Sequence, residues 1–398
     1  AKQQRTCISF PSNKQRFATK KSSPIFNSNV VISLLIHQFA LIMIRALRKR
    51  CTEKGFDLCD PIHTQWYNNL IEKEGHVTKG TLQKISTPPT ISEKSDANDA
   101  TLKYNAVLIG NSKSIWPKFI DWLSLQYGMK LEHSKEQSEQ SKQDILNQVL
   151  NDNPFDTFVT STLSNVFQSC FAEQILNGNE VVSQLSSYEF YWSNGVHYNV
   201  ALNDRATDND ESNRHTTGDY HCFANDEPSS FLLCMQRAAK VTGQYWHDEE
   251  GTKLCVHPKF GTWKAFRAVV VFHTKNKAND TNDSIIPEAP PLCPCPLSEE
   301  EIQKARESME YALKVSGYSN GYAASRGSSG TDDLCQYLHN SVSSGSDWSK
   351  VSPSMRPWIQ LRDCISVGRE EYKYCDNQIL YHYTKDVDIL KRELNLDR

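Results

Sequence analysis

WKAFRAVVVF, residues 263–272, decides the fold because it reads as one long strand. Side chains alternate across a strand, so one face is predicted to carry Trp263, Ala265, Arg267, Val269 and Val271. Arg267 is then the only charge on an otherwise apolar face. A buried guanidinium without an anion is costly, and two interpretations fit equally well. Either an internal carboxylate pairs with Arg267, or Arg267 faces a cavity that receives an anionic ligand.

HPKFGTW, residues 257–263, leads directly into this strand. Pro258 forces His257 into an extended conformation, and Gly261 lets the backbone turn back towards Trp263. Such a turn either lines the mouth of a pocket or is an ordinary packed β-turn, and both remain open. Four aromatic residues are candidate pocket walls, with core packing as the equal alternative for each: Tyr245, Trp246, Phe260 and Trp263.

Other stretches have clear periodicity. A strand at 106–110 followed by a helix at 114–125 predicts a β-α unit, and Pro154 begins a helix whose aromatic residues belong to the core. Three strand-like runs are predicted to form one compact antiparallel meander: 244–246, 253–257 and 263–273. The remaining predicted elements are a strand at 188–192, helices at 231–241 and 298–315, and a final ordered block at 358–394.

The chain has 398 residues, of which only 38% are hydrophobic. Polar, patternless tracts leave roughly 250 patterned residues, enough for one sizeable domain. We therefore predict an extension at 1–42 and a single domain at 43–398. Polar insertions are expected in this domain near 76–103, 130–143, 203–217, 275–296 and 319–347.

Charge is distributed unevenly along the chain. Ten of the 44 Lys and Arg residues precede the first acidic residue, Glu53, which leaves 34 basic against 47 acidic residues and a net charge of −13 beyond that point. An acidic body argues against nucleic acid as the main partner, because duplex binding needs clustered cations. The 12 cysteines are scattered without a CxxC pair, which indicates a reducing compartment.

The N-terminal region contains the most apolar run, NVVISLLIHQFALIMIRAL at 29–47. His37 and Gln38 interrupt it, so it fits a spanning helix poorly, whereas the basic, acid-free stretch before it fits an organellar leader or translated upstream sequence. We expect a cytoplasmic protein without stable membrane insertion, or an organellar one if residues 1–42 are a genuine leader.

Two short motifs fail their structural context. GYSNG at 317–321 matches the nucleophile-elbow pattern, but a helix precedes Ser319 where the chemistry needs a strand. Asp219 and His221 form half of a cobalt-ligating DxHxxG box whose glycine is absent, so His221 is interpreted as a loop residue. Cys293 and Cys295 are interpreted as loop cysteines in a proline-rich run.

Several blocks of the chain, in order, resemble the CblC family of cobalamin-processing proteins. The segment around HPKFGTW resembles the family's HPRFGGW-x-A-I-R-G-V-V, and GFDLCDPIHTQWYNNL at 55–70 resembles GFE-x-YPFQ-x-x-WYN-x-L. Weaker blocks are NPFDTFV at 153–159, GDYHCF at 218–223 with the helix at 231–243, Arg362-Asp363, and 374–381. The resemblance covers most of the patterned sequence.

This resemblance implies an α+β fold of the flavin-reductase or nitroreductase type, an antiparallel sheet with flanking helices. It implies an enzyme that binds cobalamin base-off and removes its upper axial ligand, by flavin-dependent (FMN or FAD) decyanation or glutathione-dependent dealkylation. Implied partners are a flavin reductase and a downstream cobalamin-trafficking protein. Arg267 and Arg362 match the family's glutathione-binding arginines. Cobalamin contacts are expected from Tyr245, Trp246, Cys255, His257, Phe260 and Trp263.

The chain also departs from the family pattern. The family's PNRRP loop matches residues 224–228, where Asp226 and Glu227 replace basic residues, and a helical histidine matches Lys240. A third glutathione arginine falls near Lys391 or Arg392 without a firm match. A non-catalytic cobalamin chaperone and a flavin-dependent reductase of the same fold are the alternative functions.

Overall fold

The structure is a computed structural model that describes residues 43–86, 104–134, 138–150, 153–176, 185–193, 195–201, 229–230, 233–274, 287–316 and 348–395. The predicted extension, the GYSNG motif, His221, Asp226 and Glu227 lie outside these residues. So do most residues of the predicted insertions, although residues 76–86 and 287–296 are described and residues 130–133 and 139–143 belong to two helices. Among the described residues, no helix is long and apolar enough to cross a membrane.

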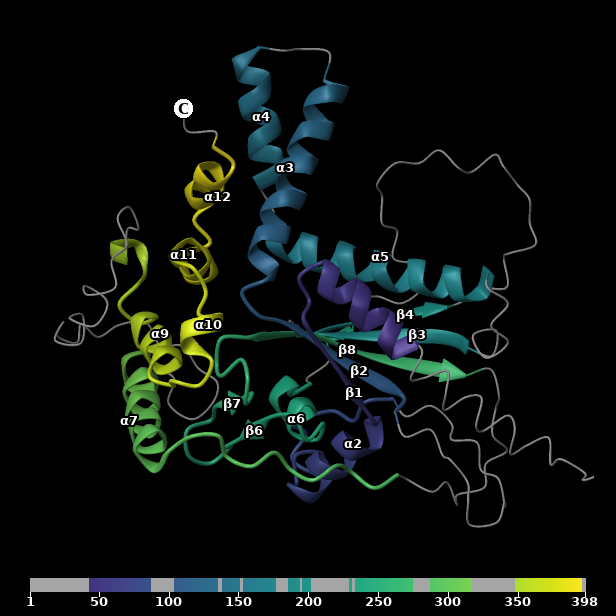
Figure 1. The fold of residues 1–398 in the computed structure, drawn as a ribbon, viewed down its shortest axis with the longest axis vertical. Coiled ribbons are helices and arrows are strands. Elements are labelled where there is room, and N and C mark those ends of the chain that lie inside the picture. The colour runs from purple at the N-terminus through teal and green to yellow at the C-terminus, as the bar shows by residue number, and fades with distance from the viewer. Residues whose placement is uncertain are drawn as a thin grey trace, which may run out of the picture.

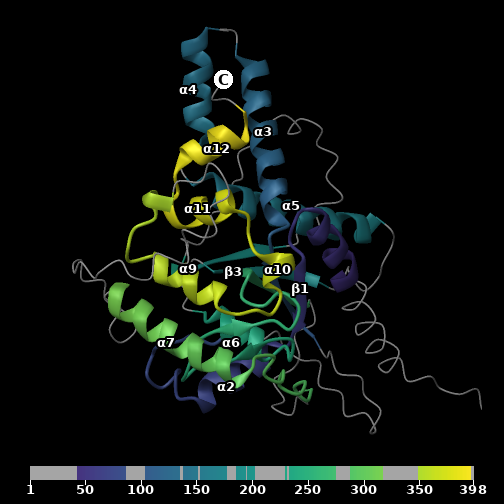
Figure 2. The ribbon, with the colours of Figure 1, turned by 60° about the vertical axis from the view of Figure 1, so that its left-hand side comes forward.

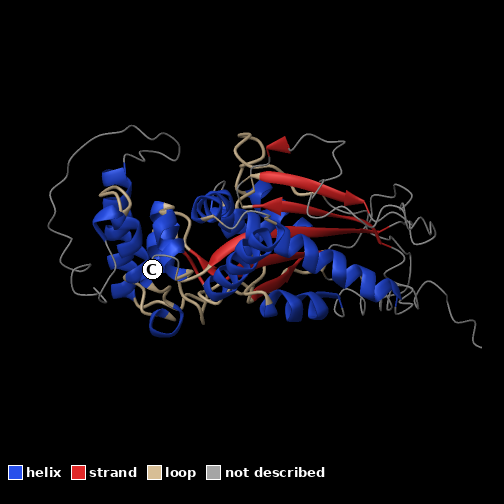
Figure 3. Ribbon diagram, turned by 90° about the horizontal axis from the view of Figure 1, so that it is seen from above, coloured by secondary structure: helices blue, strands red, loops and turns tan. Residues whose placement is uncertain are grey.

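A six-stranded sheet lies at the centre of the fold, and every pair of neighbouring strands is antiparallel. Its strand order is β1 (Leu58–Ile62), β2 (Ala106–Asn111), β8 (Ala265–Thr274), β3 (Leu185–Trp192), β4 (Val196–Ala201) and β5 (Ser229–Ser230). Figure 3 shows these strands side by side. The predicted strands in β2, β3 and β8 are confirmed, and so is an α+β fold with flanking helices.

The predicted meander is wrong in one respect. β6 (Trp246–His247) and β7 (Cys255–Val256) pair only with each other, whereas β8 lies between β2 and β3 of the large sheet. β8 is ten residues long and its central residues are fully buried, so it satisfies its backbone groups between two long strands. Two-residue strands cannot offer it that many partners.

A β-bulge in β8 changes the direction in which Arg267 points. Ile109 pairs with Ala268 and Gly110 pairs with Phe266, which leaves Arg267 as the extra residue. Such an insertion shifts the alternation of side chains by one position. Arg267 therefore lies over the Phe155 ring, whereas Val269 and Val271 pack on the opposite face of the sheet. The prediction that these three side chains share a face is wrong.

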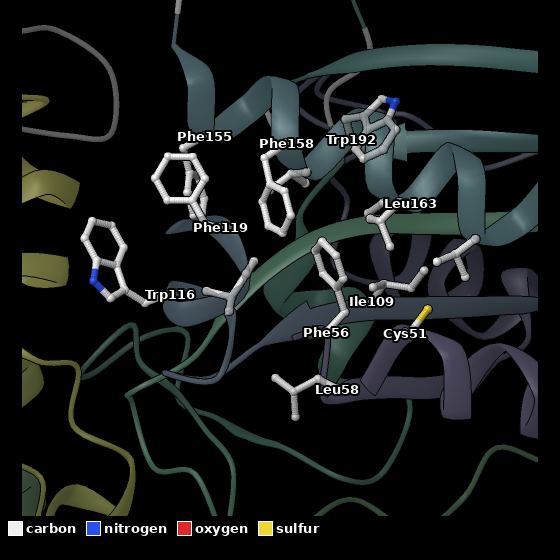
Figure 4. Packing of buried hydrophobic residues seen from close by; sticks show 14 of the residues in the cluster. Cys51, Phe56, Leu58, Ile109, Trp116, Phe119, Phe155, Phe158, Leu163 and Trp192 are labelled. Carbon is white, nitrogen blue, oxygen red and sulfur yellow. The ribbon is translucent and has the colours of Figure 1, made fainter. Parts of the chain in front are cut away.

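Helices cover both faces of the sheet (Figure 1). On one face, residues 43–53, α3 (Ile115–His133) and α5 (Pro154–Leu176) form the main core. Phe119 of α3 packs edge-on against Phe155 of α5 at 5.0 Å between ring centroids, and Phe158 joins them (Figure 4). The prediction that the aromatic residues after Pro154 are core is confirmed. α2 (Thr64–Lys73) and α6 (Met235–Lys240) cover the other face.

The predicted β-α unit is present as β2 and α3, and α3 continues into a hairpin with α4 (Glu139–Leu150) that projects from the body (Figure 1). α6 is shorter than predicted, since residues 233–234 are not helical and 231–232 lie outside the described residues. It ends at Lys240 with Val241 as its C-cap, and Gly243, with φ 71°, then turns the chain away.

The C-terminal helices form a lobe beside one end of the sheet (Figure 2). The predicted helix at 298–315 is confirmed as α7 (Glu299–Ser316), and Ser298 with Glu301 forms a capping box at its start. The final block contains η3 (Trp348–Lys350), α9 (Arg356–Asp363), α10 (Arg369–Tyr372), α11 (Asp376–Thr384) and α12 (Val387–Glu393). α7 packs along α9.

Candidate functional site

The turn at 257–263 joins the sheet to the C-terminal lobe. His257 and Gly261 exchange two backbone hydrogen bonds of 3.1 and 2.8 Å, which close the turn. Gly261 has φ 58°, and a Cβ atom there would overlap the carbonyl of Val367. Gly368, with φ 67°, would overlap the carbonyl of Lys259 in the same way. The two backbones approach so closely that both positions require glycine.

His257 shapes this turn as a neutral imidazole. Its Nδ1 accepts hydrogen bonds from the backbone N–H groups of Lys259 (2.9 Å) and Phe260 (3.3 Å). Burial, together with the charges of Lys264 and Lys259, lowers the pKa of His257 to about 4. The ring also contacts Tyr245 and Phe260, with centroids 5.0 and 4.8 Å apart.

The six predicted cobalamin contacts divide into three packing environments. Tyr245 and Cys255 belong to the core under α2 and α6, and burial raises the pKa of the Tyr245 hydroxyl and of the Cys255 thiol. The Tyr245 hydroxyl donates to Asp60. Trp246 packs with α7 and α9. Phe260 and Trp263 belong to the main core, and Trp263 is fully buried. His257 and Phe260 touch, but the structure does not bring all six to one cavity.

Two large cavities lie elsewhere. One of about 910 Å³ runs between residues 46–54, α3 and α5, and another of about 520 Å³ lies between α7, η3, α9 and α11. None of the six predicted cobalamin contacts lines either cavity. A separate polar cluster consists of residue types that can bind a metal ion: Glu74, His76 and Glu249. The Arg237 guanidinium pairs with both of its carboxylates.

Arg362 fastens the C-terminal lobe to the turn. It lies on α9 and donates to the carbonyl oxygens of Thr262 (3.2 and 2.8 Å) and Lys264 (3.2 Å). The Thr262 hydroxyl donates in return to the carbonyl of Arg362 at 2.8 Å. The guanidinium lies 4.9 Å from the ring centroids of both Trp263 and Tyr374. Much of its donor capacity is therefore used inside the protein.

Arg267 has fewer partners. Its Nε donates to Asn111 Oδ1 at 2.6 Å, and its guanidinium lies 4.9 Å from the Phe155 ring centroid. Burial lowers its pKa, although an arginine stays a cation. In the part of the chain that the structure describes, no carboxylate lies within ion-pair distance of Arg267.

Arg267 lines a cavity of about 20 Å³, which we call the Arg267 cavity. This volume holds one group of about the size of a water molecule. The other lining residues are Trp116, Phe155, Tyr374, Gln378, Tyr381, His382 and Lys385. His382 and Lys385 are exposed, whereas Tyr374 and Gln378 are buried. Arg267 and Lys385 give the cavity positive charge, which the nearby Asp156 carboxylate partly offsets, and burial lowers the pKa of His382 to about 3, so this ring is neutral.

Lys385 and His382 were not among the predicted site residues. The resemblance left the third arginine unassigned near Lys391 or Arg392; neither lines the Arg267 cavity, and Lys391 pairs with Asp388 on α12. Lys385 ends α11 in a left-handed conformation, with φ 55°. Asp386 follows directly and caps α12 by accepting from the Asp388 N–H. This capping aspartate is the sequence signal of the break between the two helices.

Comparisons with known proteins give little more. No protein-family model matches the chain, and no curated protein sequence matches it. Among solved structures, it is similar to a C. elegans B12-trafficking protein, CblC, described as a homologue of human MMACHC. The two are 13% identical, the match covers 83% of this chain and 97% of the other, and the TM-score is 0.37. Because this TM-score is so low, the α+β fold class rests on the sheet and helices of this structure and not on the comparison.

Proposed function

We propose that this chain is a cobalamin-processing enzyme that binds cobalamin base-off and removes its upper axial ligand. Support comes from sequence blocks that resemble the CblC family in order along the chain. The most specific block, HPKFGTW with Arg267, forms the turn between the sheet and the C-terminal lobe together with the strand that follows it. The name of the C. elegans protein points in the same direction.

Arg267 is the observation that carries the proposal. A half-buried guanidinium without a carboxylate partner among the described residues is costly unless an anion from outside pairs with it. Glutathione brings two carboxylates, which suit forked guanidinium donors. In this proposal Arg267 binds a glutathione carboxylate, and Arg362, held by the Thr262 and Lys264 carbonyls, keeps the site in shape and adds positive charge.

Dealkylation then needs little chemistry from the protein itself. The glutathione thiolate sulfur bonds to the alkyl carbon, the cobalt–carbon bond breaks, and its electron pair stays on the cobalt of the substrate; the thiol proton goes to solvent. The chain's own task is to hold the peptide carboxylate and orient the thiolate. Reductive decyanation draws its electrons from a reduced flavin supplied by a partner reductase.

The cobalamin contacts remain predictions. Tyr245, Trp246, Cys255, His257, Phe260 and Trp263 are wholly or largely packed inside the protein, so a corrin ring can contact at most their exposed edges in this conformation. The described residues that line the 520 Å³ cavity include Glu307, Asp363 and Asp376 as well as Lys304, Arg369 and Lys373. These charges balance, so that cavity does not fit a flavin phosphate and no step is assigned to a resident flavin.

Visible spectra test the proposed function. Purified protein is mixed with cyanocobalamin, flavin, NADPH and a reductase, and separately with methylcobalamin and glutathione. A base-off shift on binding followed by conversion of the corrin spectrum supports the enzyme. Binding with an unchanged spectrum would favour the chaperone. Tight flavin binding without any cobalamin-induced spectral or thermal shift would favour a flavin-dependent reductase.

A further inference from the structure

Residues 287–296, PEAPPLCPCP, lie between β8 and α7 in the chain and form neither a helix nor a strand. Figure 1 shows this segment, which we call the proline strap, running beneath α2 and α6. Five of its ten residues are prolines, and each proline fixes its own φ at about −65°. The residue before a proline is held extended as well, which restricts Ala289, Pro290, Cys293 and Cys295. The sequence therefore favours a polyproline II (PPII) helix, which has about three residues per turn.

Burial in the proline strap repeats every third residue. Pro287, Pro290 and Pro296 are half-buried, and Cys293 is buried. All six positions between them are exposed: Glu288, Ala289, Pro291, Leu292, Pro294 and Cys295. This repeat matches the turn of a PPII helix. One edge of the strap therefore faces the body of the protein, and two edges face solvent.

The inner edge is fastened along its length. Trp66 Nε1 on α2 donates to the Pro287 carbonyl at 2.7 Å. A Cβ atom on Gly243, just after α6, would lie 2.7 Å from the Pro291 carbonyl oxygen and 3.1 Å from the Pro290 side chain. Leu297, the next residue after the strap, belongs to the core formed with α7 and α9. The strap is thus held in its extended shape before any partner arrives, so binding it costs little conformational entropy.

The outer edges are largely apolar. Leu292 is 65% exposed, more than Leu125 (59%) and Met129 (39%), the other large hydrophobic side chains that are exposed in the part of the chain that the structure describes. Pro291 and Pro294, on the neighbouring edge, are exposed as well. A single exposed leucine is ordinary. A leucine between two exposed prolines on a preformed PPII helix, however, offers the surface that aromatic side chains pack against in PPII-binding grooves.

We infer that the proline strap is a docking site for a protein module whose aromatic-lined groove recognises PPII helices, as SH3, WW and EVH1 domains do. The two outer edges enter the groove, and the inner edge stays on the body. Because the strap has no basic residue and its one charge is Glu288, the groove of the partner is neutral or basic beside its aromatic side chains. This surface goes beyond the proposed function and does not depend on it.

Purified SH3, WW and EVH1 domains, immobilised as an array and probed with the full chain, test this docking site. At least one module should bind with a dissociation constant below about 100 μM, measured by calorimetric titration. Leu292→Asp should weaken that complex at least about tenfold, because it removes the burial of a leucine side chain. Leu125→Asp on α3 is the matched control: it makes the same change at a similarly exposed leucine and should leave binding unchanged.

Pro291→Ala tests the shape of the strap. It removes an exposed ring and the constraint on φ, so it should weaken the same complex about three- to tenfold while circular dichroism shows an intact fold. Failure of every module to bind, or equal binding by Leu292→Asp and the unmodified chain, would show that the strap only braces the fold and would overturn the inference. Equal weakening by Leu125→Asp would place the contact on α3 and overturn it as well.

Discussion

Arg267 shows how one extra residue in a strand changes the direction in which a side chain points. Without the bulge, its side chain would alternate with Phe266 and Ala268 and pack against the opposite face of the sheet. With the bulge, the guanidinium reaches the start of α5 and lies near α11. The cost of holding a cation there without a carboxylate partner among the described residues is the physical reason to expect an anionic ligand.

Arg267→Leu should reduce glutathione-dependent dealkylation by about 10- to 100-fold, because it removes a charge-assisted carboxylate contact. Cobalamin affinity should change by less than about threefold. Methylcobalamin spectra recorded with and without glutathione measure both quantities, and Arg267→Lys is the control that keeps the charge. Equal loss of binding and dealkylation would show that Arg267 has only a structural role.

His63 should make the free energy of unfolding depend on pH. It caps α2 with its Nδ1, which accepts from the Gln65 N–H at 3.2 Å, and it is 1% exposed. Burial lowers its pKa to about 4 in the folded state. Above the unfolded value of about 6.5 both states are neutral and nothing is lost. As pH falls from about 6.5 to 4, only the unfolded state gains a proton, so stability should drop by up to about 3 kcal/mol.

Thermal unfolding at pH 7 and pH 5 measures this loss. The variant His63→Asn keeps a good capping side chain but does not titrate, so its melting temperature should fall less on acidification than that of the unmodified chain. An identical fall in both proteins would show that His63 does not contribute. His257 also accepts backbone N–H groups and has a lowered pKa, so part of the drop should persist in the variant.

At the scale of elements, the turn at 257–263 is the join between two lobes. The backbone of the turn meets the loop between α9 and α10 through Gly261 and Gly368, and Arg362 ties α9 to the carbonyls of the same turn. Packing between the two lobes thus accounts for most of the contacts of the HPKFGTW block. The block affects the Arg267 cavity only indirectly, because it positions β8.

Gly261→Ala should destabilise the protein by more than about 2 kcal/mol, because the new Cβ overlaps the Val367 carbonyl and the residue keeps a left-handed conformation. Denaturant unfolding followed by circular dichroism measures the change. Gly128→Ala in the middle of α3 is the matched control: its Cβ meets nothing within 4 Å. That variant should be neutral or more stable by up to about 1 kcal/mol. A similar effect of both substitutions would argue against a tight join.

At the scale of the molecule, the Arg267 cavity lies where the sheet, α3, α5 and α11 meet. A ligand bound there contacts β8 and α11 at once. It should therefore stabilise the join between the two parts rather than either part alone.

S-methylglutathione at 100 times its dissociation constant should add about 2.7 kcal/mol to the free energy of unfolding. Hydrogen exchange should slow at residues 374–385 and at the turn 257–263 together, and the tip of the α3–α4 hairpin, which projects away from the sheet in Figure 1, should be unaffected. Protection confined to 374–385 would mean that the ligand does not couple the lobes. The variant Arg267→Leu provides the reference without a bound ligand.

The sequence by itself was sufficient for the elements whose signals are local. Periodicity and caps predicted β2, α3, α5, β3 and α7, because a buried helix face or strand leaves its period in the chain whatever it packs against. It also singled out Arg267 as a charge in an apolar strand, and the resemblance to the CblC family singled out Arg362.

Only the tertiary structure decided the rest. The separation of β8 from the β6–β7 hairpin, the bulge that turns Arg267, and the meeting of Arg267 with Gln378 and Lys385 all depend on contacts between residues far apart in the chain. Strand partners and cavity walls are set by competition for burial and for backbone hydrogen bonds across the whole molecule. No local pattern records the outcome of that competition.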